Sequence, residues 1–276
     1  MVISKTRRTK ETLRELNVRP SKERGQNFLI RPDVTESIAL FGKAPSDAHI
    51  VEIGPGTGAL TGHFAGAKKL TLIEIEPKFC DPLRERFPNA QIINQDVRTV
   101  DFSELGDELI VFGNIPYVFS TEIVFRLLAY RSSIQYAVMM VQREFAARLA
   151  ADPGGRIYGS ITVAVQLWTD VELGPLVPGS AFHPPTEVES QVMKLTFRKT
   201  PRAPVDDPKH FERVVRAAFS QRRKKMVNSL TASRGWTRET VEAALVTIGI
   251  DLGIRPEQLS VEQFSQLAAA LPLAQL

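Results

Sequence analysis

The sequence predicts an α/β fold in which an open parallel sheet is followed by a small all-α domain. Over residues 48–141, short runs rich in β-branched residues alternate with longer segments, as in βαβ units. Several of these runs are almost entirely apolar, as strands buried on both faces should be. Beyond residue 208 the apolar residues instead recur at helical spacing. These three observations define a doubly wound sheet with a helical domain after it.

Seven strands are predicted in chain order. The five expected parallel strands cover residues 49–53, 69–75, 90–94, 108–113 and 134–141. The segments between them are long enough to hold crossover helices. Two further β-rich runs, 168–173 and 191–197, are separated by a loop with four prolines. We expect this pair to close the sheet as an antiparallel hairpin.

Helices are also expected before the first strand and after the last strand in the sequence. Asp33 with Glu36 resembles a capping box and predicts a helix ahead of the first strand. After a proline-rich linker at 199–208, helical periodicity covers 211–219, 237–248 and 260–271, and Ser260 with Gln263 forms a second capping box. We therefore divide the chain into a basic N-terminal segment (1–31), an α/β domain (32–198) and a helical domain (199–276).

The composition is that of an ordinary globular protein. Of 276 residues, 43% are hydrophobic and 24% are charged, and no apolar stretch reaches the roughly 20 residues that a membrane span needs. The single cysteine, Cys80, cannot form an internal disulfide, and no apolar block makes a signal peptide of the N-terminus. The four histidines lie too far apart for a typical zinc site. We expect a monomeric cytoplasmic protein without a metal.

The basic residues are concentrated in two regions. The net charge of the chain is only +4, but residues 1–31 hold nine Lys or Arg against three acids, and residues 198–234 hold eleven against three. The rest of the chain is correspondingly acidic. Two basic regions around an acidic middle favour a polyanionic partner, although a solvated tail and a charged helix would give the same pattern.

A glycine-rich loop follows the first predicted strand. Gly54, Gly56 and Gly58 allow a tight turn and the close approach of a ligand to the backbone. About 20 residues later, Glu74 stands at the end of the second strand, where a carboxylate can accept hydrogen bonds from ribose hydroxyls. Glu76 is the nearby alternative. Together these features predict a nucleotide-type cofactor, either a nicotinamide dinucleotide or S-adenosylmethionine.

The loop after the fourth strand favours S-adenosylmethionine. Asn114 supplies an amide oxygen, Pro116 stiffens the turn, and Tyr117 supplies a flat face on which a base can stack. The lone pair of an exocyclic amine such as adenine N6 is delocalised into the ring. Acceptors at the side chain of Asn114 and the carbonyl of Ile115 would bind the amine protons and let the nitrogen pyramidalise toward a methyl donor.

With these motifs in order, the chain resembles the rRNA adenine N6-dimethyltransferases over nearly its whole length. The matching motifs are residues 25–29 (GQNFL), 52–58 (EIGPGTG), 74 (E), 94–96 (NQD), 114–117 (NIPY) and 181–185 (AFHPP). The resemblance implies a Rossmann-like class I S-adenosylmethionine-dependent methyltransferase fold. It also implies that the target adenine leaves its stack to enter the site.

The resemblance further implies roles for individual residues. The implied cofactor-binding residues are Asn27, Leu29, Gly54, Gly56, Glu74, Asp96 and Asn114. Asp96 would face the adenine amine of the cofactor. The target adenine would be held by Asn114 and Ile115 and sandwiched between Tyr117 and Phe182. The run of Arg222, Arg223, Lys224 and Lys225 would contact rRNA phosphates from the helical domain.

The resemblance leaves two branches of the family open, and the two branches differ in their rRNA substrate. The C-terminal half is similar to the small-subunit (KsgA-like) branch at residues 141–144, 158–159, 219–225, 228–230 and 259–264. That branch implies N6,N6-dimethylation of adenines near the 3′ end of 16S rRNA in the 30S particle during ribosome assembly. Ile115, where that branch usually has Leu, is instead typical of Erm-type 23S rRNA methyltransferases that confer macrolide resistance. An RNA-binding assembly factor with little turnover and a nicotinamide dehydrogenase are the alternatives from other classes.

Overall fold

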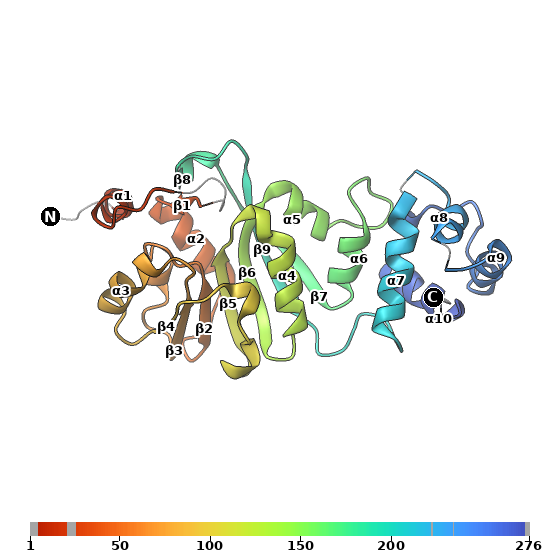
Figure 1. Cartoon of the computed structure of the whole chain (residues 1–276), viewed down its shortest axis with the longest axis horizontal. Coiled ribbons are helices and arrows are strands. Elements are labelled where there is room, and N and C mark those ends of the chain that lie inside the picture. Colours follow the sequence, from red (N-terminus) through yellow and green to blue (C-terminus); the bar gives the residue numbers. More distant parts are fainter. Residues whose placement is uncertain (1–4, 21–25, 222, 234, 274–276) are drawn as a thin grey trace. The chain divides into compact units, whose positions relative to one another are not determined.

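The structure is a computed structural model that describes residues 5–20, 26–221, 223–233 and 235–273 (Figure 1). The chain forms two compact units. The first comprises the residues up to Ala146 together with Val171–Phe197, and the second comprises Ala147–Asp170 with the residues from Arg198 onward. No helix in the described part of the chain is long and apolar enough to cross a membrane.

The first unit is built on a seven-stranded sheet with the order β4-β3-β2-β5-β6-β9-β7. The strands are β2 (His49–Ile53), β3 (Lys69–Ile73), β4 (Gln91–Ile93), β5 (Leu109–Asn114), β6 (Ile134–Gln142), β7 (Thr169–Val177) and β9 (Ser190–Phe197). Strands β2 to β6 are parallel where they pair, and β9 runs antiparallel to β6. All seven predicted strands are confirmed, with small differences at their ends.

Helices fill only two of the four crossovers between the parallel strands. These are α3 (Pro77–Arg86) and α4 (Ser120–Ala129). The crossover from β2 to β3 contains only η1 (Thr61–His63), and that from β4 to β5 contains η2 (Val97–Thr99) and η3 (Phe102–Glu104). Our expectation of a helix in each crossover was wrong for these two. Glycines at five positions of the first segment disfavour an α-helix, and aspartates in the second cap short turns instead.

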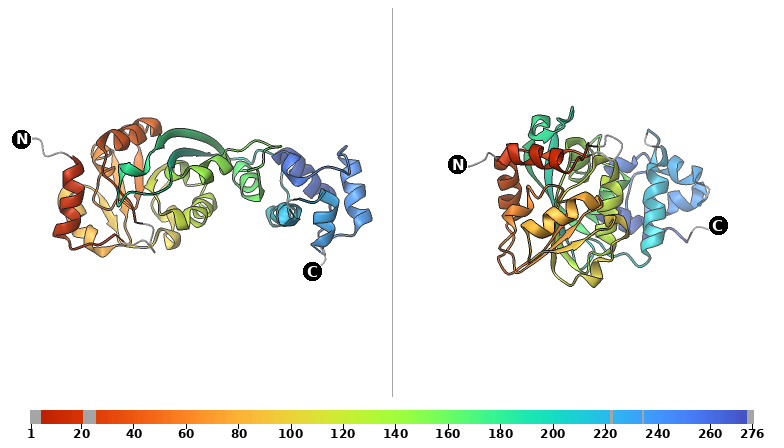
Figure 2. Two further views of the ribbon diagram at one scale, coloured as in Figure 1. Left: turned by 90° about the horizontal axis from the view of Figure 1, so that it is seen from above. Right: turned by 60° about the vertical axis from the view of Figure 1, so that its left-hand side comes forward.

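The N-terminal part of the first unit adds two helices and a small second sheet. The helices are α1 (Lys5–Glu15) and α2 (Pro32–Gly42), and the sheet pairs β1 (Phe28–Leu29) antiparallel with β8 (Phe182–His183). Both views of Figure 2 show α1 beside α2 at the N-terminal end of this unit. The capping box predicted at Asp33 is wrong: Arg31 is the N-cap residue and α2 begins with a proline, which suits the first helical position.

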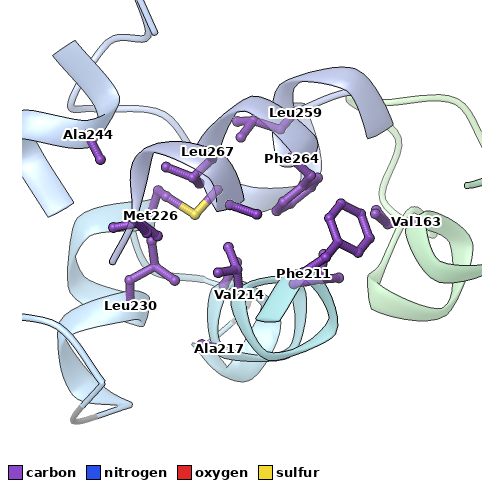
Figure 3. Close-up of a cluster of buried hydrophobic side chains, with 14 of the residues drawn as sticks. Val163, Phe211, Val214, Ala217, Met226, Leu230, Ala244, Leu259, Phe264 and Leu267 are labelled. Atoms are coloured by element: carbon purple, nitrogen blue, oxygen red, sulfur yellow. The ribbon is translucent and has the colours of Figure 1, made fainter. Parts of the chain in front are cut away.

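The second unit is helical. It contains α6 (Ser160–Gln166), α7 (Pro208–Ala218), η6 (Phe219–Gln221), α8 (Met226–Ala232), α9 (Arg238–Thr247), η7 (Pro256–Gln258) and α10 (Val261–Ala270). α5 (Arg143–Leu149) spans the boundary. Figure 3 shows the core, in which Phe211 of α7 lies close to Val163 of α6 and Phe264 of α10. This packing explains why residues 147–170 belong here and not to the α/β domain that we predicted over 32–198.

Candidate cofactor pocket at the ends of the parallel strands

A pocket lies where the carboxyl ends of four parallel strands meet. Gly54 and Gly56 after β2, Glu74 after β3, Asp96 after β4 and Asn114 at the end of β5 all line it. Ligands of open α/β sheets bind at this edge. The structure therefore brings together residues that are 60 positions apart in the sequence and that we had predicted to share one site.

The glycine loop gives the pocket one wall of bare backbone. Gly54 and Gly56 have φ of 65° and 53°, a left-handed conformation that glycine adopts without strain. A Cβ on Gly56 would lie 3.0 Å from the ring of Phe28, which also lines the pocket. Gly56 is therefore required both for its conformation and for the close approach of Phe28.

Glu74 is the buried carboxylate of the pocket. It is 4% exposed, and its two oxygens accept hydrogen bonds from the backbone N–H groups of Gly56 (2.9 Å) and Glu76 (2.8 Å). Burial raises its pKa, while these two hydrogen bonds act in the opposite direction. The bonds orient the carboxylate, and each oxygen keeps a lone pair for a ligand hydroxyl.

Asp96 is held by an arginine that the sequence analysis did not single out. The Nε of Arg98 lies 3.1 Å from both carboxylate oxygens of Asp96, and its Nη2 lies 2.6 Å from Oδ2. This ion pair, with the backbone N–H of Arg98, lowers the pKa of Asp96. The guanidinium also bonds Glu122 (2.8 Å) and lies 4.1 Å from the ring centre of Phe119. Arg98 thus links a carboxylate and an aromatic ring that both line the pocket.

Asn114 and Tyr117 stand together at the end of β5. The Nδ2 group of Asn114 donates to the carbonyl oxygen of Asn27 at 2.9 Å, so its amide oxygen is left as an acceptor. Ile115, Pro116 and Tyr117 also line the pocket. The hydroxyl of Tyr117 is hydrogen-bonded to Ser190, and burial raises its pKa, so it stays a neutral phenol. This arrangement offers a hydrogen-bond acceptor beside an aromatic ring.

Two predicted site residues do not line the pocket. Phe182 is only 2% exposed and belongs to the hydrophobic core of the first unit. Leu29 is 4% exposed and is the partner of Phe182 in the β1–β8 pair. Phe182 therefore does not line the pocket with Tyr117 in this structure, and its stacking on the target adenine stays a prediction.

One more carboxyl group lies beneath the glycine loop. Glu52 of β2 is 2% exposed, and its Oε2 atom has no hydrogen-bond partner among the described residues. Burial raises its pKa to about 8, and the nearby Glu74 adds to the effect. Glu52 is therefore mostly neutral at pH 7, and Glu74 is the carboxyl of the pair that lines the pocket.

The predicted RNA-binding run lies in the second unit. Arg223, Lys224 and Lys225 are exposed in the turn ahead of α8, whereas Arg222 lies outside the described residues. The resemblance places these cations on the helical domain, and the structure places the three described ones in a turn of the second unit. Within the described ranges, no group of three or more His, Cys, Asp or Glu side chains could hold a metal ion.

The pocket fits S-adenosylmethionine by the chemistry of its donors. A bare glycine backbone allows close approach, Glu74 can accept from ribose hydroxyls, and Asp96 can accept from an adenine amine. Apolar surfaces for the adenine ring come from Phe28, Ile75 and Phe119. Each of these groups lies at the same sheet edge as Asn114.

Comparisons with known proteins agree with this reading of the pocket. Residues 18–272 match the family model described as ribosomal RNA adenine dimethylase. The ribosomal RNA small subunit methyltransferase A of Geobacillus thermodenitrificans is 39% identical and covers 96% of this chain and 95% of its own length. The protein of the same name from Bacillus mycoides is 37% identical over 99% of each chain.

Solved structures show the same fold. The crystal structure of the 23S rRNA methyltransferase ErmE has a TM-score of 0.72 at 30% identity, and it covers 89% of this chain and 99% of its own. A dimethyladenosine transferase from Plasmodium falciparum also gives a TM-score of 0.72, at 23% identity over 87% of this chain and 95% of its own. The second likeness concerns the fold alone.

Proposed function

Because the chain belongs to the ribosomal RNA adenine dimethylase family, we propose that it dimethylates adenine N6 near the 3′ end of 16S rRNA in the 30S particle. The chain is an S-adenosylmethionine-dependent rRNA adenine N6,N6-dimethyltransferase. The assignment to the small subunit is supported by relatives of that name that match nearly end to end at 37 to 39% identity. We further propose that the protein acts as a monomer during ribosome assembly.

The observation that carries the proposal is that Asn114 and Tyr117 line the same pocket as Glu74 and Asp96, at the carboxyl ends of the parallel strands. S-adenosylmethionine supplies an electrophilic methyl group on a sulfonium. Glu74 would bind its ribose and Asp96 its adenine amine, while the backbone of Gly54 and Gly56 allows the chain to lie close to it. These contacts hold the donor and exclude water from it.

The residues of the β5 loop would act on the target base. The Oδ1 atom of Asn114 and the carbonyl oxygen of Ile115 accept hydrogen bonds from the N–H groups of the adenine amine, and Tyr117 stacks on the ring. Because the Asn27 carbonyl fixes the Nδ2 group of Asn114, Oδ1 is presented with little freedom. Accepting these hydrogen bonds draws the nitrogen lone pair out of conjugation, so that no strong general base is needed.

The test is transfer of labelled methyl groups to unmethylated 30S particles by the wild-type protein and by Asn114→Ala. We expect dimethyladenosine from the wild type and a loss of at least a hundredfold in kcat from the variant, on the order seen when a transition-state acceptor is removed. Binding of the RNA should be retained. Asn89→Ala, in the exposed turn after α3, is the control and should keep full activity.

Two results would contradict the proposal. Full transfer by Asn114→Ala would exclude the acceptor role of the amide. No transfer from the wild type to 30S particles at any stage of assembly would exclude the small subunit as substrate.

A further inference from the structure

A second recess in the first unit is lined by cations. Its lining consists of Lys10, Leu13, Arg14, Asn17, Val18, Arg19, Pro20 and His183. The lining includes no aspartate or glutamate, and within the described residues no ion pair is formed by Lys10, Arg14 or Arg19. Three positive side chains therefore line one cavity, and none of them forms an ion pair with a residue that the structure describes.

The geometry of α1 explains how these cations come together. Residues 10, 13, 14 and 17 are spaced by three and four, so they share one face of the helix and its C-terminal end. Leu13 is 4% exposed and packs in the core, whereas Lys10, Arg14 and Asn17 are exposed beside it. Glu11 and Glu15 are not part of the lining.

The turn after α1 brings the third cation back to the same place. Asn17 adopts a left-handed conformation with φ of 47°, and the N–H of Val18 donates to the carbonyl of Leu13 at 2.9 Å. The Nζ group of Lys78 in α3 holds the carbonyl of Asn17 at 3.3 Å. These contacts fix the turn that places Arg19 in the same recess as Lys10 and Arg14.

The recess adjoins the cofactor pocket through the small sheet. His183 of β8 lines the recess and is the Cα partner of Phe28 in β1, which lines the pocket. Antiparallel partners have their Cα atoms about 5 Å apart, so the two cavities lie on neighbouring strands. An RNA that places one nucleotide in the pocket can therefore reach the recess with the next nucleotide.

We propose that α1, its following turn and His183 form a binding site for a backbone phosphate of the RNA next to the nucleotide whose base enters the pocket. The site rests on the proposed function, because its ligand is the substrate RNA. Arginine and lysine bind phosphate by charge-assisted hydrogen bonds, and such contacts fix register without reading sequence. Burial, together with Lys10 and Arg14, lowers the pKa of His183, so its neutral ring adds a hydrogen-bond donor at pH 7.

The first test compares two charge-neutralised variants in RNA binding. Lys10→Gln/Arg14→Gln removes two cations of the recess, and Lys43→Gln/Lys68→Gln removes two exposed cations from the opposite, amino-terminal edge of the sheet. Both variants have the same net charge. The probe is a short single-stranded RNA that contains one adenine, and its affinity is measured over a range of salt concentrations.

We expect the recess variant to bind more weakly and to lower the slope of log K against log salt by about 0.7 for each lost phosphate contact. The control variant should keep the wild-type slope. S-adenosylmethionine should bind all three proteins equally. Equal slopes for the two variants would overturn the proposal, because the recess would then contribute only net charge.

The second test replaces the phosphates that flank the adenine by neutral methylphosphonates. The replacement should weaken binding to the wild type and to the Lys43→Gln/Lys68→Gln control, but should have little further effect on the recess variant, since the two changes remove the same contact. If the losses of binding free energy caused by the methylphosphonates and by the recess variant were additive, the proposed phosphate site would be contradicted.

Failure of the proposed function gives a different result. If the wild type transferred no methyl group to RNA while the two tests still separated the variants, the phosphate site would stand and the enzymatic assignment would fall.

Discussion

At the scale of single residues, the pocket is fixed by hydrogen bonds from backbone groups and neighbouring side chains. The Asn27 carbonyl orients the amide of Asn114, and the N–H of Gly56 orients the carboxylate of Glu74. Both residues were predictable because each follows a strand in a short motif. Arg98 was missed because an arginine two positions after an aspartate has no signal of its own, and only the fold brings Phe119 beneath it.

Arg98 should control the affinity for the cofactor without contacting the target base. Arg98→Gln removes the bidentate partner of Asp96 and the cation on Phe119, so we expect S-adenosylmethionine to bind roughly tenfold more weakly, as measured by calorimetry. Arg84→Gln, which removes an exposed ion pair with Asp81 in α3, is the matched control and should leave the affinity unchanged. Equal affinities for the two variants would show that Arg98 does not position Asp96.

Glu52 should make the protein less stable as the pH rises. Its pKa is about 8 in the folded state against about 4.5 when unfolded, so between these values the folded state binds more protons. Stability is therefore lost as pH rises through this window. Glu52→Gln keeps the neutral shape and should raise the free energy of unfolding at pH 7 by on the order of 3 kcal/mol, with little effect at pH 4.5.

The measurement for Glu52 is urea unfolding of the wild type and Glu52→Gln across that pH range. The exposed Glu85→Gln in α3 is the control and should follow the wild type. If the difference between Glu52→Gln and the wild type did not grow with pH, the buried carboxyl would not be neutral in the folded protein.

At the scale of elements, periodicity predicted the strands better than the helices. The parallel strands are apolar along most of their length, and all of them except the edge strand β4 are mostly buried, as strands covered on both faces should be. α6 escaped prediction because its seven residues are too short for a clear helical period. The burial of Phe182 could not be predicted either, since it depends on a two-residue strand pairing between segments more than 150 positions apart.

The capping box of α10 is another element-scale feature that the sequence predicted correctly. The Oγ atom of Ser260 accepts from the N–H of Gln263 at 3.3 Å, and Oε1 of Gln263 accepts from the N–H of Ser260 at 2.9 Å. Ser260→Ala should lower the free energy of unfolding of the helical unit by about 1 kcal/mol. Ser260→Asp retains an acceptor and should stay near the wild type in the same denaturation experiment. Equal stability of Ser260→Ala and the wild type would mean that the cap adds nothing to α10.

At the scale of the whole molecule, the residues predicted or proposed to bind the cofactor and the RNA are divided between the two units. The first unit contains the cofactor pocket and the basic recess, and the second presents Arg223, Lys224 and Lys225 on its surface. The charge pattern of the sequence predicted the two basic regions. It could not predict that residues 147–170 join the helical unit, because that depends on the packing of α6 against α7.

The identity of the rRNA substrate tests the assignment of the whole chain most directly. Curated relatives named for the small subunit match it most fully among those described, while the ErmE structure, a 23S rRNA methyltransferase, shares its fold at 30% identity. Labelled methyl transfer should therefore be run on unmethylated 30S particles beside protein-free 23S rRNA, followed by nuclease digestion and mass analysis. We predict dimethyladenosine in the 30S sample alone. Dimethyladenosine in the 23S sample alone would contradict the assignment and make the chain a large-subunit enzyme.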